Sequence, residues 1–134
     1  MDSKKYKKRK IRHLVSLPFI WANIVTIMAA DVVLEIYHRI CFPLYGLPYV
    51  SRKRYIRIDR HRLKYLPLKN KIGCAYCGYA NGWVHYAAAI AANTEQYWCG
   101  IKHEKIAGIY EPKHHKNFIE YGDEAEFREK FNPN

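Results

Sequence analysis

The longest apolar stretch of the chain lies near its N-terminus. Residues 14–30 (LVSLPFIWANIVTIMAA) are seventeen in number and carry no charge, and apolar positions also dominate from Val32 to Val50. A helix of that length reaches about 25 Å, which is at the short limit for a hydrocarbon core of about 30 Å. The pattern predicts a membrane-associated helical segment over residues 14–50.

Cations flank this segment on both sides. Seven lie in the basic tail (residues 1–13) and nine in the basic connector (residues 51–71). Because a single span would carry one cluster across the membrane, we expect a re-entrant or interfacial hairpin, with limbs at 14–30 and 32–42, that ends at Pro43, Gly46 and Pro48. A single span and the buried core helix of a soluble protein are the alternatives.

The charge distribution indicates where the protein is located. Of the 134 residues, the first 71 carry 17 Lys and Arg against 4 Asp and Glu, whereas the remainder carries 6 against 8. A basic half beside an apolar segment predicts the cytoplasmic membrane, with the rest of the chain on the cytoplasmic side. The expected contacts with anionic phospholipids are Lys7, Lys8, Arg9, Lys10, Arg52, Lys53 and Arg54.

Three polar residues interrupt the apolar segment. Asp31, Glu35 and His38 are spaced four and three apart, so a helix places them on one face. A polar stripe near the headgroups, with Glu35 paired to Arg39, is one interpretation. A secondary metal site completed by another subunit is the other, because Glu-x-x-His is the ligand spacing of di-iron helix bundles.

Four residues have the spacing of a zinc site. Cys74, Cys77, Cys99 and His103 form a C-x2-C-x21-C-x3-H pattern, and three thiolates with one imidazole suit a tetrahedral Zn²⁺. In CAYCG we expect Gly78 to permit a knuckle turn. Iron in the same site, or a redox dithiol, are alternatives. His85, His114 and His115 compete with His103, and we assign no ligand role to Cys41.

The segment between the two ligand pairs predicts a helix. Asn81 is a suitable N-cap, and residues 82–97 are rich in alanine, with one apolar face that includes Tyr86 and Ile90. In the connector, the alternation around Ile56 and Ile58 indicates a short strand or an extended segment. We therefore expect a mainly α protein with a membrane helix or hairpin, a zinc-binding module (residues 72–121) and an acidic tail (residues 122–134) that contains a short helix over 124–131.

The order of several sequence blocks resembles that of a family of small, uncharacterised bacterial proteins. The blocks are EIYHRICFPLYGLPYV, RIDRHRL, CAYCGYANG and YWCGIKH, and the resemblance covers about residues 30–105. It implies a bacterial, membrane-associated protein and assigns no catalytic residue.

Two main classes of function follow from these patterns. The first is a membrane-associated, zinc-binding accessory protein that docks a protein partner. The second is a rubredoxin-like iron electron carrier at the membrane. A zinc-containing nucleic-acid binder is a third, based on cations interleaved with aromatic residues in the connector. The sequence shows no nucleophile–base pair or phosphate-binding loop, and four protein ligands leave zinc no open position, which argues against an enzyme.

Overall fold

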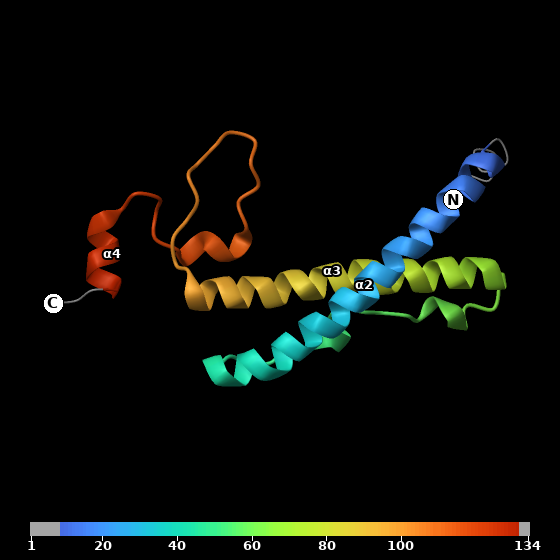
Figure 1. The fold of residues 1–134 in the computed structure, drawn as a ribbon, viewed down its shortest axis with the longest axis horizontal. Helices are drawn as coiled ribbons and strands as arrows, with labels where there is room; N and C mark the ends of the chain where they lie inside the picture. Colours follow the sequence, from blue (N-terminus) through green and yellow to red (C-terminus); the bar gives the residue numbers. More distant parts are fainter. Residues whose placement is uncertain (1–8, 132–134) are drawn as a thin grey trace. The chain divides into compact units, whose positions relative to one another are not determined.

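A computed structural model describes residues 9–131, and in this range the protein is mainly helical, as predicted. The elements are the helices α2 (Lys10–Tyr45), α3 (Leu68–Trp98) and α4 (Glu124–Phe131), with short 3₁₀ turns at Arg52–Arg54, Arg60–Arg62 and Lys113–Asn117 (Figure 1). The described chain divides into two compact units, with the boundary after Ala87 inside α3.

Helix α2 is continuous over 36 residues, so the predicted hairpin is wrong. Asp31 was expected to separate two limbs, but it lies in the helix interior, where the guanidinium of Arg52 binds its carboxylate. The expected stop is confirmed at Gly46 but not at Pro43, since the helix continues through Pro43 to Tyr45. The left-handed backbone of Gly46 (φ 69°) lets the amides of Gly46 and Leu47 bond to the carbonyls of Pro43 and Phe42.

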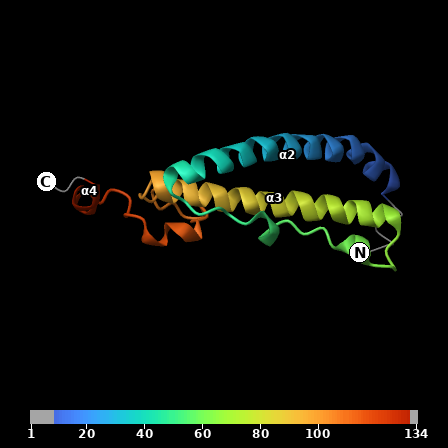
Figure 2. The ribbon, with the colours of Figure 1, turned by 90° about the horizontal axis from the view of Figure 1, so that it is seen from below.

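The first unit pairs α2 with the first part of α3 in parallel orientation. Three hydrogen bonds link positions that advance together along both helices: Asn23 with Tyr76, Asp31 with Tyr79, and Glu35 with Tyr86. Since parallel neighbours need a long return connection, the connector runs back along α3 (Figure 2). It contains the 3₁₀ turns Arg52–Arg54 and Arg60–Arg62, and residues 56–59 between them are neither helix nor strand. Of the two predicted alternatives for this segment, the short strand is therefore wrong.

Two glycines of α3 admit the backbone of the connector. A Cβ atom at Gly82 would lie 2.6 Å from the carbonyl oxygen of Tyr55 and 2.8 Å from Cα of Ile56. A Cβ atom at Gly78 would overlap the carbonyl oxygen of Arg57. Gly78 therefore serves close packing of the connector on a helix and not a turn in a zinc knuckle.

Helix α3 begins fourteen positions earlier than predicted, at Leu68 instead of Gly82. Asn81 is not an N-cap: its side-chain amide donates to the carbonyl of Cys77 from within the helix. Tyr86 and Ile90 of the predicted apolar face are buried, as expected, and His85 is exposed.

The second unit contains the end of α3, a loop and α4, whose bounds are those predicted. An isolated parallel bridge joins Ile101 to Ile119, and the amide of Lys102 donates to the carbonyl of Ile119 (2.8 Å). Phe118 and Ile119 are buried here beside His115. This small core fixes the 3₁₀ turn at Lys113–Asn117 against the unit.

Candidate metal centre

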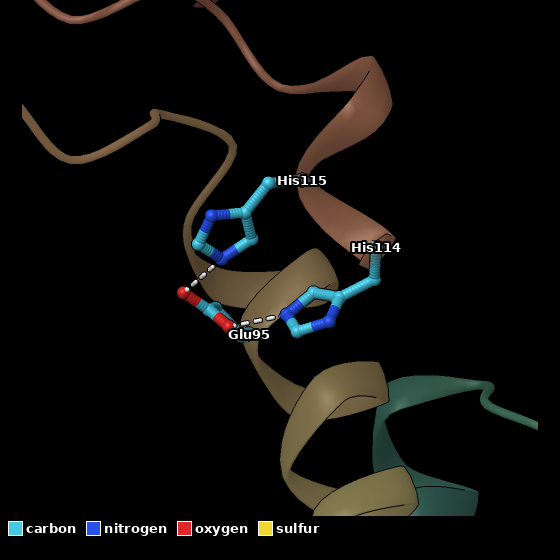
Figure 3. Close-up of side chains that lie close together, drawn as sticks. All are labelled: Glu95, His114 and His115. Carbon is cyan, nitrogen blue, oxygen red and sulfur yellow. Dashed lines mark hydrogen bonds and ion pairs between the residues drawn. The ribbon is translucent and has the colours of Figure 1, made fainter. Parts of the chain in front are cut away.

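Two adjacent histidines and one glutamate converge in the second unit. Nε2 of His114 lies 2.6 Å from Oε2 of Glu95, and Nε2 of His115 lies 3.0 Å from Oε1 of the same carboxylate (Figure 3). One ligand atom from each residue lies within 4.8 Å of the others. The three side chains therefore form a possible metal-binding triad.

Local structure explains why neighbouring histidines reach one carboxylate. Pro112 has an extended backbone and precedes the 3₁₀ turn, in which the amide of His115 bonds to the carbonyl of Pro112 (3.0 Å). A 3₁₀ turn has three residues per turn, so consecutive side chains diverge by about 120° and flank the carboxylate from two sides. Glu95 comes from the last turn of α3.

Packing fixes the imidazole of His115 more firmly than that of His114. His115 is buried, with 2% of its surface exposed, and its ring stacks on Phe118 at 4.7 Å. The ring of His114 packs edge-on against that of His115 at 4.6 Å and remains partly exposed. One ligand of the triad is thus held in a fixed orientation, while one side of the site faces solvent.

The carboxylate of Glu95 is held in its ionised form. Hydrogen bonding to His114 is the main cause that lowers its pKa, and the bond to His115 acts in the same direction, although burial opposes both. Two imidazole nitrogens and one carboxylate form the His₂Glu set of many zinc sites and the facial triad of iron(II) sites. Either metal would keep at least one position for water or for a ligand from a partner.

The structure does not bring the predicted cysteine ligands together. Cys74 and Cys77 lie inside α3, and Cys99 directly follows its end. A zinc knuckle needs a turn at CAYCG, but this segment is helical, so the predicted turn is wrong. The four-ligand set of Cys74, Cys77, Cys99 and His103 stays a prediction.

The remaining predicted ligand, His103, is exposed. Its ring lies 5.9 Å from that of His115, so it is near the triad without belonging to it. His114 and His115 were predicted only as competitors of His103, and Glu95 was not predicted as a ligand. The sequence does carry a signal for it, since Glu95 is the sole charged Asp, Glu, Lys or Arg residue from 72 to 101.

Asp31, Glu35 and His38 form a closed polar cluster in the first unit. Arg52 binds both carboxylate oxygens of Asp31, at 2.6 and 2.5 Å, and the hydroxyl of Tyr79 donates to Asp31 at 2.6 Å. Glu35 accepts from Arg39 at 2.9 Å, which confirms the predicted pair. The proximity of Asp31 raises the already high pKa of Arg52, so this pair stays charged.

His38 completes the cluster through a chain of hydrogen bonds with one direction. The amide of Val50 donates to Nε2 (3.1 Å), so in the neutral ring Nδ1 carries the proton and donates to the hydroxyl of Tyr86 (2.9 Å). That hydroxyl donates to Glu35 at 2.9 Å. Burial raises the pKa of Tyr86 to about 12, which keeps the donor protonated. Both ring nitrogens of His38 thus have hydrogen-bond partners. Among the described residues, Asp31, Glu35 and His38 do not form a cluster of ligand atoms that could hold a metal ion.

The expected lipid contacts fall into three groups. Arg9, Lys10, Lys53 and Arg54 are exposed and accessible to a headgroup. Arg52 is half-buried on Asp31, so its guanidinium is already neutralised within the protein. Lys7 and Lys8 lie outside the described residues.

Comparison of the chain with protein-family models, with curated proteins and with solved structures finds no match. The resemblance to a family of small bacterial proteins therefore stays a prediction. The residues and contacts within each unit are therefore the basis for proposing a function.

Proposed function

We propose that this protein is a membrane-associated accessory protein that binds one Zn²⁺ through Glu95, His114 and His115. The observation that carries the proposal is the convergence of two imidazoles on one carboxylate, with one ligand atom from each residue within 4.8 Å of the others. We prefer this set to the predicted cysteine set because its ligand atoms converge within one unit, whereas the CAYCG segment is helical and has no knuckle turn.

The chemistry of the triad favours a divalent transition metal. Neutral imidazole nitrogens suit zinc and iron, and the ionised carboxylate of Glu95 supplies negative charge. The alternative, a rubredoxin-like iron carrier, would use the cysteine set and not this triad. The partly exposed side of the triad leaves room for a fourth ligand from water or from a docked partner.

Membrane attachment is supported by α2. Among the described residues, α2 is the one helix that is long enough and apolar enough to cross a membrane. Only a small share of its apolar window is buried inside the protein, 6%, which is unlike a soluble core helix. A bilayer would cover this apolar surface.

Metal analysis and zinc titration test the proposal. Purified protein should carry about one equivalent of zinc, and metal-free protein should rebind it, as measured by calorimetry. Glu95→Gln and His115→Ala should each weaken zinc binding strongly. His85→Ala, at an exposed position of α3, is the control and should leave zinc binding unchanged. If Cys77→Ser and Cys99→Ser abolish zinc binding while Glu95→Gln leaves it unchanged, the site is a cysteine site and the proposal fails. If the purified protein carries iron instead of zinc and Glu95→Gln removes it, the triad is the metal site and the assignment to zinc is wrong.

A further inference from the structure

We infer that α2 lies flat in the membrane interface, with one apolar face inserted into lipid, and does not cross the bilayer. The inference rests on the membrane attachment proposed above and specifies its geometry. It concerns a surface that we call the outer face of α2. Its residues are Ile11, Leu14, Val15, Trp21, Val25, Val32, Val33, Ile36, Ile40 and Leu44.

The outer face is continuous and apolar along the whole helix. Each of its residues is more than half exposed, from 53% for Trp21 to 79% for Ile11. At 3.6 residues per turn these residues fall within an arc of about 140° around the helix axis. Among the described residues of α2, Arg39 is the one charged residue in this arc, and it lies at the edge. An unpartnered apolar stripe of this length needs a covering surface.

The length of the outer face does not fit a membrane crossing. From Ile11 to Leu44 it extends about 50 Å, whereas the hydrocarbon core is about 30 Å thick. Burying the whole face by spanning would require a tilt of about 50°, beyond the usual range of about 0–40°. A helix in the plane of the interface buries all of it.

The other side of α2 gives a second, independent argument. Asp31 contacts Tyr79 and Arg52 there, and Tyr79 directly follows Gly78, on which the backbone of Arg57 packs. A span centred on the apolar stretch would therefore bring the connector into the hydrocarbon. Its backbone is irregular and its exposed side chains include Arg57, Asp59 and Arg60.

Hydrocarbon does not tolerate such a segment. Lipid-exposed irregular backbone leaves peptide groups without partners, and charged side chains at membrane depth are costly. With α2 in the interface plane, its outer face enters lipid while Asp31, the first part of α3 and the connector stay outside the hydrocarbon.

The charge at the start of α2 identifies the occupant as anionic lipid. Arg9, Lys10 and Arg12 begin the helix, and four more lysines precede them in the sequence. These cations attract anionic headgroups, whereas they would repel the same cluster on a second copy aligned in parallel. Cations at one end of a helix and a tryptophan within its exposed apolar surface, here Trp21, are features that interfacial helices share.

Flotation and depth measurements on the full chain test the inference. Spin labels are placed singly at Leu14, Val25, Ile36 and Leu44 after the four native cysteines are changed to serine, and the depth of each label is measured in phosphatidylglycerol–phosphatidylcholine vesicles. A label at Asp59 is the control. The four outer-face labels should share one shallow depth of about 5–10 Å, and the label at Asp59 should stay in water.

The possible failures are distinguishable. A profile that is deepest at Val25 and shallow at Leu14 and Leu44 would show a span and overturn this inference alone. Absence of vesicle binding, or a soluble dimer with coupled outer-face labels, would overturn membrane attachment as well; zinc binding is measured separately. As a check without substitutions, trypsin added to wild-type protein on vesicles should cleave both the basic tail and the connector in every bound molecule.

Discussion

Glu95 carries the charge of the candidate metal centre, and its pKa makes a prediction about pH. Its pKa is lowered from the ordinary value of 4.5, chiefly by the hydrogen bond from His114. A carboxylate with a depressed folded-state pKa contributes stability that is present above 4.5 and is lost as the pH falls through the folded-state value. Metal-free wild-type protein should therefore melt at a higher temperature than Glu95→Gln at pH 6.

Thermal unfolding of both proteins between pH 6 and pH 3 checks this sign. The difference in Tm should shrink below about pH 4.5, where the carboxylate takes up a proton and comes to resemble the amide. A difference that stays constant down to pH 3 would show that Glu95 does not act through its charge.

Tyr86 connects two polar groups in the first unit through one hydroxyl. Tyr86→Phe leaves the Nδ1 proton of buried His38 and one oxygen of half-buried Glu35 without this partner. An unsatisfied buried polar group costs about 1–3 kcal/mol, so urea unfolding should show a loss of stability of that order. Tyr110→Phe, at a residue that is 76% exposed, is the matched control and should change stability little. Equal stability of Tyr86→Phe and wild type would contradict the hydrogen-bond chain.

At the scale of elements, α3 contains two glycines in opposite surroundings. A methyl group at Gly82 would collide with the backbone of Tyr55 and Ile56, whereas one at Gly73 would meet nothing within 4 Å. Gly82→Ala should destabilise by about 1–3 kcal/mol through overpacking, and Gly73→Ala should stabilise by up to about 1 kcal/mol through helix propensity. Chemical denaturation of the pair measures both signs. If both variants were stabilised, the connector would not pack on α3 as described.

The same element shows what the sequence could and could not predict. Local signals were sufficient for α4 and for the helix stop at Gly46, because caps and charge patterns act within a few residues. The CAYCG motif predicts a metal knuckle because a glycine after the second cysteine permits the tight turn that a knuckle needs. Its actual role depends on Arg57, which reaches Gly78 only after the connector has turned back along α3.

Contacts between distant residues also explain the other errors. Asp31 does not interrupt α2 because Arg52, 21 residues later, forms an ion pair with it. Glu95 bonds to His114 and His115, which follow it by 19 and 20 positions, so no spacing rule brings the three together in advance. Residue types indicated that metal-binding chemistry is present, but the partners depend on the tertiary fold.

At the scale of the whole molecule, the two proposed activities lie in separate units. The outer face of α2 belongs entirely to the first unit, and Glu95, His114 and His115 belong to the second. Because the two sites have no residue in common, we expect substitutions in one to leave the other unchanged. Variants of the outer face should therefore bind zinc as the wild type does, and variants of the triad should bind vesicles as the wild type does.

The sharpest test of this independence introduces one negative charge on the outer face. Ile36→Glu removes apolar burial worth about 1.5–3 kcal/mol and places a carboxylate against anionic lipid, so its affinity for phosphatidylglycerol vesicles should fall at least about tenfold. Tyr65→Glu adds the same charge at a residue of the connector that is 79% exposed, and should weaken binding much less, since Tyr65 does not enter lipid. Cosedimentation measures both affinities, and zinc content is measured on the same samples. An equal loss in the two variants would mean that net charge alone holds the protein to the membrane. A selective loss in Ile36→Glu with full zinc content would show that an inserted helix face attaches to the bilayer a protein whose metal centre works independently of it.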